Sequence, residues 1–144
     1  MSELTQMIRT HYDGNESGDL DLALSVYDAD VEVVTPSGPM RGIAALRAFG
    51  EAFQTAVPNS RHEILHSYEA GDTIIVEGIY SGTQTGALVG PGGTLPPTGR
   101  DFRLPYVDVL TARDAKFVTH HIYWDNVAFM TQLGLMPAPQ VSAV

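Results

Sequence analysis

The chain of 144 residues is long enough for one domain that encloses a small-molecule pocket, but too short for two hydrophobic cores. Apolar residues make up 44% of it and charged residues 17%, a composition typical of globular rather than disordered or fibrous proteins. The net charge of −9 repels phosphate backbones and anionic lipid, so we expect neither a nucleic acid nor a membrane as a partner.

The chain has no cysteine, which excludes disulfides, thiolate catalysis and cysteine-ligated metal centres. No apolar run reaches the length needed to cross a bilayer. The opening residues MSELTQMIR are typical of a helix rather than of a signal peptide. We therefore expect a cytoplasmic protein.

Three amphipathic helices are predicted before residue 58. The first presents one apolar stripe, formed by Leu4, Met7, Ile8, His11 and Tyr12. Asp19 can cap the second helix, because its carboxylate accepts the free N–H groups of the first turn. The third carries Leu46, Phe49 and Phe53 on one face, and a strand over 30–35 precedes it.

After residue 60 the apolar pattern changes to period two, which indicates strands. Two hairpins are predicted, one from segments 60–69 and 73–82 and one from segments 101–112 and 116–125. Between them, 83–99 is rich in glycine and proline, and we interpret it as a long loop over a pocket mouth or a sheet edge. Asn126 is expected to cap a last short helix that Gly134 closes.

This order of elements predicts an α+β domain over residues 1–136, followed by a flexible tail over 137–144. A curved antiparallel sheet would wrap around the three N-terminal helices, with the short helix at the C-terminal end. A sheet covered by helices on one face bends around them and leaves a cone-shaped cavity. We therefore expect a ligand-binding architecture.

Several local strings resemble the SnoaL-like polyketide cyclases, a family of the nuclear-transport-factor-2-like superfamily. They are SGDLDLALSVYDADVEVVTP (17–36), GPMRGIAALRAF (38–49), GTQTG (82–86), PPTGR (96–100), ARDAKF (112–117) and YWDNVAFMTQLGL (123–135). They follow the family's order over about four fifths of the chain. GTQTG, PPTGR and the terminal D…QLGL are the more specific strings, whereas the front half is shared by the whole superfamily.

The resemblance implies the nuclear-transport-factor-2-like cone-shaped fold and an enzyme without cofactor that closes a ring in an aromatic polyketide by intramolecular aldol chemistry. It also implies that the acid/base is a pocket aspartate at the end of the last strand, which is Asp125 here. The chain departs from the family at two positions. Gln84 replaces a common histidine, and His121 replaces a frequent tryptophan.

A tight turn centred on Asp114 and Ala115 would set the register of the second hairpin. It would pair Asp108 with His121, Tyr106 with Tyr123, and Leu104 with Asp125 on one face. We assign that face to the pocket. The opposite face would collect Val107, Val109, Val118, His120, Ile122 and Trp124, and we assign it to the interface of a homodimer.

The catalytic candidates are Asp125 and His121. Asp125 could remove a proton from a carbon flanked by carbonyls and return it to the new alkoxide, and the alternative is that it only caps the final helix. His121 could engage the other end of a flat ligand. The expected residues that bind the hydrophobic, carbonyl-rich substrate are Asp108, Tyr123, Tyr106, Tyr12, His62, Tyr80, Phe49 and Phe53.

No cofactor and no metal are expected. By alternation His62 and His66 share one face of a strand, and Glu77 lies near His66 across the first hairpin, but spacing fixes no third ligand.

The same fold leaves other functions as alternatives. Ketosteroid isomerisation needs an aspartate as base at the position where this chain has Thr35. Limonene-type epoxide hydrolysis needs an Asp-Arg-Asp arrangement, and Arg103 alternates onto the face opposite Asp108. A small-molecule-binding dimer without turnover stays open, because a fold does not settle function.

Overall fold

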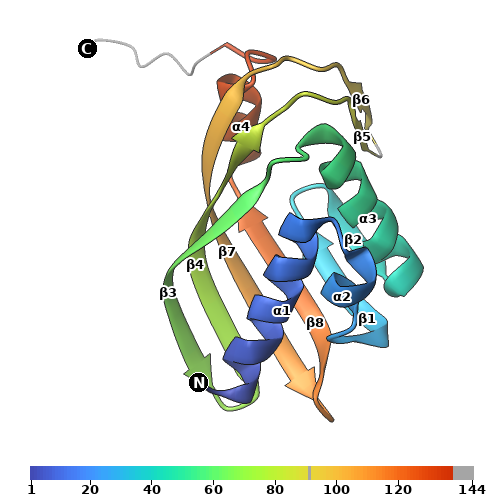
Figure 1. The fold of residues 1–144 in the computed structure, drawn as a ribbon, viewed down its shortest axis with the longest axis vertical. Helices are drawn as coiled ribbons and strands as arrows, with labels where there is room; N and C mark the ends of the chain where they lie inside the picture. The colour runs from blue at the N-terminus through green and yellow to red at the C-terminus, as the bar shows by residue number, and fades with distance from the viewer. Residues whose placement is uncertain (91, 138–144) are drawn as a thin grey trace.

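A computed structural model describes residues 1–90 and 92–137 (Figure 1). Helices α1 to α3 cover one face of a bent sheet, and α4 lies beyond one end of it (Figure 1). This is the predicted α+β arrangement. The predicted tail over 137–144 lies outside the described residues except for residue 137. None of the described helices is both long and apolar enough to cross a membrane.

Three of the four described helices begin after a residue whose side chain caps the first turn, whereas α3 follows Gly42 without such a cap. Their bounds are α1 Glu3–Ser17, α2 Leu20–Leu24, α3 Ile43–Ala56 and α4 Asn126–Gln132. The Ser2 side chain accepts the N–H of Thr5 at the start of α1, and Asp19 accepts that of Leu22 at the start of α2, as predicted. The stripe of α1 is buried except for the half-buried Leu4. Gly14 lets α1 approach α2, because a Cβ there would lie 2.3 Å from the backbone nitrogen of Ala23.

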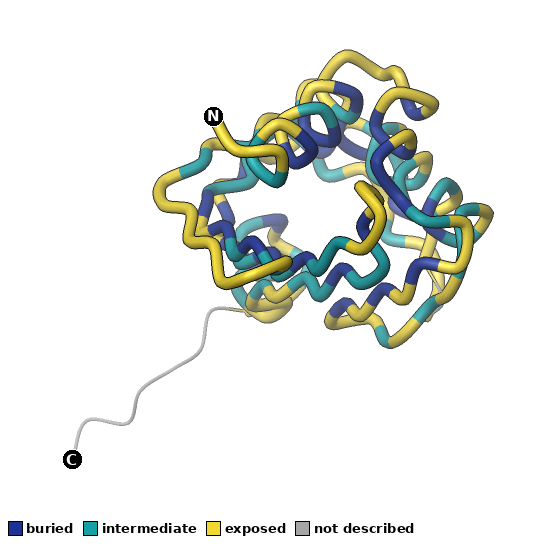
Figure 2. The backbone as a smooth tube through the Cα atoms, turned by 90° about the horizontal axis from the view of Figure 1, so that it is seen from below, coloured by how far each residue is buried: buried dark blue, intermediate teal, exposed yellow. Residues whose placement is uncertain are grey.

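Six strands form the main sheet in the order β2-β1-β8-β7-β4-β3. Their bounds are β1 Tyr27–Thr35, β2 Gly38–Arg41, β3 Arg61–Ala70, β4 Thr73–Thr83, β7 Asp101–Arg113 and β8 Lys116–Trp124. Neighbouring strands are antiparallel except β1 and β8, which run parallel. The short strand β2 was not predicted. Buried and exposed residues alternate along β7, and Figure 2 shows from below how burial varies along the sheet.

The register of the β7–β8 hairpin differs from the predicted one by one residue. Asp114 and Ala115 form the expected tight turn with φ of 53° and 61°, and Ala112 pairs with Phe117. A bulge then inserts Val118, so that the next pair is Thr111 with Thr119. Every later pair is shifted.

The predicted pairs of this hairpin are therefore wrong. Asp108 pairs with Ile122, Val107 with Tyr123, and Val109 with His121. A shift of one residue moves each β8 side chain to the other face of the sheet. His120, Ile122 and Trp124 consequently face the helices, contrary to prediction.

A second bulge lies in β3. His62 pairs with Tyr80 on the helix-facing side, but the register shifts between Ile64 and His66. His66 then pairs with Glu77 on the outer side, where both are exposed. The expectation that His62 and His66 share a face is therefore wrong.

The segment 83–99 contains a small hairpin of β5 (Leu88–Gly90) and β6 (Gly93–Leu95). Gln84 is fully buried and ties this segment together. Its amide donates to the carbonyls of Gly86 and Pro96, at 3.2 and 2.9 Å, and accepts from the Thr98 hydroxyl at 2.7 Å.

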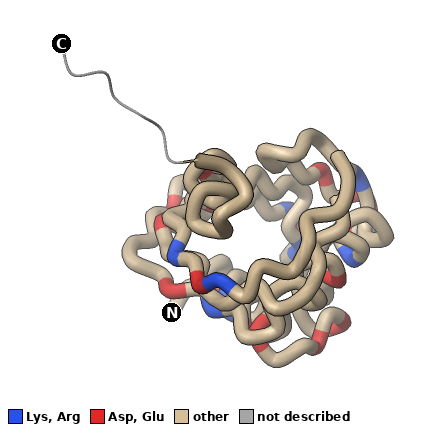
Figure 3. The backbone as a smooth tube through the Cα atoms, turned by 90° about the horizontal axis from the view of Figure 1, so that it is seen from above, with Lys and Arg blue, Asp and Glu red and all other residues tan. Residues whose placement is uncertain are grey.

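The last helix, α4, is capped by Asp125 rather than by the predicted Asn126. Asp125 Oδ1 accepts the N–H of Ala128 at 3.0 Å. Acidic and basic residues are interspersed around this end of the molecule (Figure 3).

Candidate functional site

A cavity lies between the helices and the concave face of the sheet. Its aromatic lining consists of Phe49 and Phe53 from α3, Tyr80 from β4, Tyr106 from β7, Trp124 from β8 and Phe129 from α4. Its acidic and histidine lining consists of His11, His62, Asp108 and His120. No lysine or arginine lines it among residues 1–90 and 92–137. The site therefore suits a flat, hydrophobic molecule that presents a few polar atoms.

Most of the residues predicted to bind substrate lie at this cavity. Phe49, Phe53, His62, Tyr80, Tyr106 and Asp108 line it. Tyr12 lies directly behind the lining and is 4% exposed. Contact of these residues with a substrate stays a prediction.

The polar centre of the cavity is a buried pair formed by Asp108 and His120. His120 Nε2 lies 3.1 Å from Asp108 Oδ1, although the two are not aligned for a hydrogen bond. The pair is held from behind by two phenols. Tyr12 donates to Asp108 Oδ2 at 2.6 Å, and the Tyr27 hydroxyl lies 2.8 Å from His120 Nδ1. All four residues are at most 5% exposed.

These contacts keep the carboxylate charged. Burial by itself would raise the pKa of Asp108, but the nearby His120 and the hydrogen bond from Tyr12 hold that pKa below its usual value. Burial and the same carboxylate raise the pKa of Tyr12 well above its usual value. Tyr12 therefore remains a donor to an ionised Asp108.

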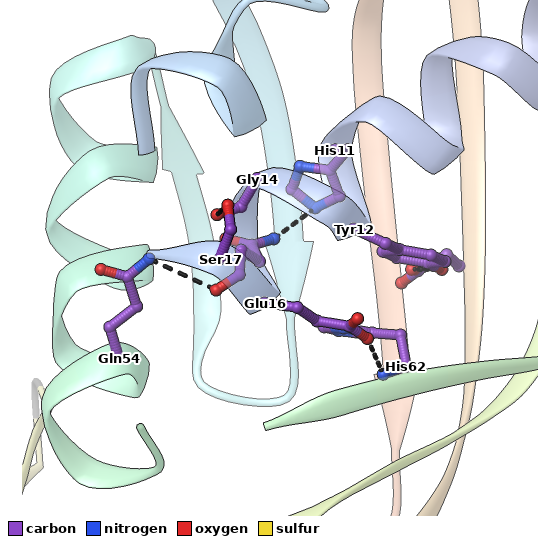
Figure 4. Close-up of polar contacts among 9 residues, drawn as sticks. His11, Tyr12, Gly14, Glu16, Ser17, Gln54 and His62 are labelled. Carbon is purple, nitrogen blue, oxygen red and sulfur yellow. Dashed lines mark hydrogen bonds and ion pairs between the residues drawn. The ribbon is translucent and has the colours of Figure 1, made fainter. Parts of the chain in front are cut away.

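His11 is a neutral neighbour of this pair. Burial and the nearby His120 lower the pKa of His11 to about 3. A neutral ring has one N–H, and because Nδ1 lies 3.1 Å from the carbonyl oxygen of Ala23, Nδ1 carries it. His11 Nε2 then accepts the Asn15 amide at 3.1 Å, a contact drawn in Figure 4. His11 therefore shapes the cavity without carrying charge.

Tyr106 offers a phenol without a partner among the described residues. Its hydroxyl is buried and makes no hydrogen bond there. Tyr106 pairs with Gly78 across β4 and β7, and a Cβ at Gly78 would lie 2.5 Å from that hydroxyl oxygen. The glycine thus leaves room for the ring to lie across the strand. Burial and the charge of Asp108 raise the pKa of Tyr106, so the phenol stays protonated.

Three residues predicted for the pocket lie elsewhere. Because of the β8 bulge, His121 and Tyr123 lie on the outer face of the sheet, where Tyr123 is 53% exposed. Asp125 is exposed, caps α4, and is not among the residues that line the cavity.

Sequence reasoning missed His120, His11 and Trp124 as lining residues. The signal for His11 is its place in the predicted apolar stripe of the first helix. His120 and Trp124 had no signal beyond alternation along β8, and alternation fails after a bulge.

The sequence matches the model of the SnoaL-like polyketide cyclase family over residues 5–133. The chain belongs to this family. A search of curated proteins finds none that matches.

Solved structures show the same fold. A Jannaschia sp. CCS1 protein named for this family has a TM-score of 0.81 at 20% identity, covering 96% of this chain and 94% of that chain. TsrD from Streptomyces laurentii has a TM-score of 0.81 at 22% identity, with 93% and 96% covered. A Catenulispora acidiphila protein with a ketosteroid isomerase-like fold, solved with trimethylamine, has a TM-score of 0.74 at 20% identity, with 94% and 97% covered.

Two alternative site arrangements do not form around Asp108. Arg103 is 67% exposed at its side chain and lies 3.5 Å from Glu63, on the face opposite Asp108, so the arginine needed for epoxide hydrolysis is absent from the cavity lining. Thr35 is buried and its hydroxyl accepts the N–H of Ser37, so no base of the ketosteroid isomerase type stands there.

Proposed function

We propose that the cavity catalyses the intramolecular, aldol-type ring closure of an aromatic polyketide or a similar carbonyl-rich hydrophobic molecule, without a cofactor. The acid/base in this proposal is the Asp108–His120 pair. The observation that carries it is a carboxyl group 3.1 Å from an imidazole, both buried in the wall of an aromatic cavity, where the nearby His120 and the hydrogen bond from Tyr12 hold the pKa of Asp108 below its usual value. Membership of the SnoaL-like polyketide cyclase family supports the reaction class.

The chemistry requires a base of only moderate strength. A carbon between two carbonyl groups is already acidic, so a carboxylate can remove its proton when the reacting atoms are held in place. In this proposal the proton is taken up between Asp108 Oδ1 and His120 Nε2, which lie 3.1 Å apart. The Tyr27 hydroxyl contacts Nδ1, the other ring nitrogen of His120, and this contact keeps the imidazole oriented.

The enolate that forms needs a hydrogen-bond donor. Tyr106 is suited to this role, because its hydroxyl has no partner among the described residues and remains protonated. A donor placed before the reaction stabilises the developing negative charge without reorganisation, which is worth about 3 kcal/mol in comparable sites.

Asp125, the candidate from the sequence, is the rival within the same reaction class. Its position at the start of α4 serves as a helix cap, and its exposure gives it a solvated carboxylate. We therefore place it second to Asp108. The two assignments predict opposite results for matched variants.

The test compares wild type, Asp108→Asn, His120→Gln and Asp125→Ser on a panel of aromatic polyketide esters, with binding and product formation followed separately. Serine at 125 keeps the cap. We expect Asp108→Asn and His120→Gln to bind within about threefold of wild type but to lose at least 100-fold in rate. Loss only in Asp125→Ser would transfer the role to Asp125. Binding without conversion in wild type would favour a binding protein, and hydrolysis of an added epoxide would favour the epoxide hydrolase.

We further propose that the outer face of the sheet joins two copies of the chain. Paired positions run across it from strand to strand, in the row Val34, His121, Val109, Ile75 and Tyr68. Val34, Tyr68 and the neighbouring Tyr123 are 36%, 52% and 53% exposed. An apolar sheet face of this kind is stabilised when a second copy covers it.

A further inference from the structure

A second carboxylate–imidazole pair lies at the same cavity, formed by Glu16 at the end of α1 and His62 near the start of β3 (Figure 4). Glu16 Oε1 accepts the backbone N–H of His62 and lies 3.8 Å from its ring Nδ1. The side chains are 29% and 15% exposed. His62 Nδ1 is buried on the Glu16 side, and the ring lines the cavity, so its Nε2 side is left for a ligand.

One tyrosine connects the two pairs. The Tyr12 ring stacks on His62 with the ring centroids 4.4 Å apart and the planes 5° from parallel. The hydroxyl of the same ring donates to Asp108 Oδ2 at 2.6 Å. Both pairs thus contact a single aromatic ring, His62 on its face and Asp108 at its hydroxyl.

We propose that His62, held by Glu16, is a second catalytic residue of the ring closure and donates the proton that the acceptor carbonyl oxygen gains. This inference rests on the proposed function. Glu16 is a positioning residue, because it acts through the imidazole.

An aldol closure needs proton transfer at two atoms that lie close together. The Asp108–His120 pair takes the proton from the donor carbon, and the freed electron pair forms the bond to the acceptor carbonyl carbon. The π electrons of that carbonyl move to its oxygen, which takes a proton from His62. The product is an isomer of the substrate that carries a hydroxyl group. His62 then regains a proton from water, and the Asp108–His120 pair releases one.

The groups around His62 suit a proton donor. Those facing it are Tyr12 and Glu16 on α1, Tyr80 on β4 and Tyr106 on β7, with Arg61 beside Glu16 and with Asp108 and His11 farther away. Burial raises the pKa of each of the three phenols, so they stay neutral. The hydrogen bond to His62 lowers the pKa of Glu16, so a negative charge faces the imidazole.

The first experiment separates the two proton transfers. An aromatic methyl ester with a 1,3-diketone side chain is incubated in D2O, and NMR follows both deuterium exchange at the donor carbon and ring closure. We expect His62→Gln to exchange within threefold of wild type but to close the ring at least 100-fold more slowly. His120→Gln should lose both deuterium exchange and ring closure. Closure that survives in His62→Gln, or exchange that falls as far as closure, would overturn the assignment.

The second experiment tests Glu16 through the pH dependence of ring closure. Glu16→Gln removes the negative charge that faces the imidazole, and we expect the high-pH fall in the rate of ring closure to move down by about one pH unit. Glu16→Asp should restore part of the shift, and Asp13→Asn, which removes an exposed carboxylate from the same helix, should leave it unchanged. An even loss of rate at every pH would mean that Glu16 is only structural.

A binding measurement keeps the inference independent of turnover. The probe is 4-nitro-1-naphthol, a flat phenol whose absorption reports whether its oxygen is ionised. We expect wild type to bind it, His62→Gln to bind at least tenfold more weakly, and Asp13→Asn to match wild type. Equal affinity in wild type and His62→Gln, or no binding by wild type, would refute an oxygen-facing role for His62. If wild type binds the probe but shows neither exchange nor closure, the proposed function fails, and only the placement of His62 beside a ligand oxygen stands.

Discussion

Replacing Tyr12 with phenylalanine removes one hydroxyl from the buried network and leaves the aromatic ring in place. That hydroxyl donates to the charged Asp108 over 2.6 Å, and both residues are at most 4% exposed. A buried hydrogen bond to a charged group contributes about 2 kcal/mol. Tyr12→Phe should therefore raise the unfolding equilibrium constant about 30-fold at pH 7 and lower the Tm by roughly 6 °C.

The loss of stability in Tyr12→Phe should depend on pH, and the direction of that dependence follows from the pKa of Asp108. Because its pKa is lowered in the folded protein, its contribution to stability is present above the unfolded pKa of about 4 and is lost as the pH falls through the folded value. The hydrogen bond from Tyr12 is one cause of that lowering. The difference in the free energy of unfolding between wild type and Tyr12→Phe should therefore become smaller as the pH falls below about 4.

Urea unfolding of both proteins at pH 7 and at the lowest pH where wild type is folded measures this gap. Tyr27→Phe is the matched control, because its hydroxyl is equally buried but contacts His120 Nδ1 rather than the carboxylate. Its loss should be about 1 kcal/mol. Equal losses for the two variants at both pH values would refute the view that Tyr12 stabilises a charged Asp108.

Three further predictions concern other parts of the chain. Gln84→Ala should lower the free energy of unfolding by about 2–3 kcal/mol, since it removes three hydrogen bonds from a fully buried amide, and thermal unfolding measures the loss. Asp125→Ala should cost about 1 kcal/mol in urea unfolding through loss of the helix cap, whereas Asp125→Ser should cost little. Tyr123→Glu should turn the proposed dimer into a monomer in sedimentation equilibrium, and a wild-type monomer at all concentrations would contradict that interface.

Local signals in the sequence were sufficient to predict the helices. All of the α1 stripe except the half-buried Leu4 is buried, because apolar residues at helical spacing reach one side of a helix whatever packs against it. Asp19 caps α2 because capping involves only the first turn. The family resemblance supplied the fold that local signals could not, and the family match confirms it.

The loop over 83–99 shows a limit of composition. Its glycine and proline content predicted a long loop, and the structure contains a short hairpin held by Gln84. The partners of that amide are backbone carbonyls up to twelve residues away, and composition does not encode which carbonyls come within reach.

The sequence by itself determined the strands of the two long hairpins, where the β7–β8 turn lies, and that acids, imidazoles and phenols gather there. Only the tertiary structure decided which of them face the cavity. Val118 occupies one extra position in β8, so His120 meets Asp108 while His121 and Tyr123 point outward. A strand has a side-chain period of two, so one unpaired residue reverses every face beyond it. No local pattern marks that residue, because the packing of the sheet against the helices selects it.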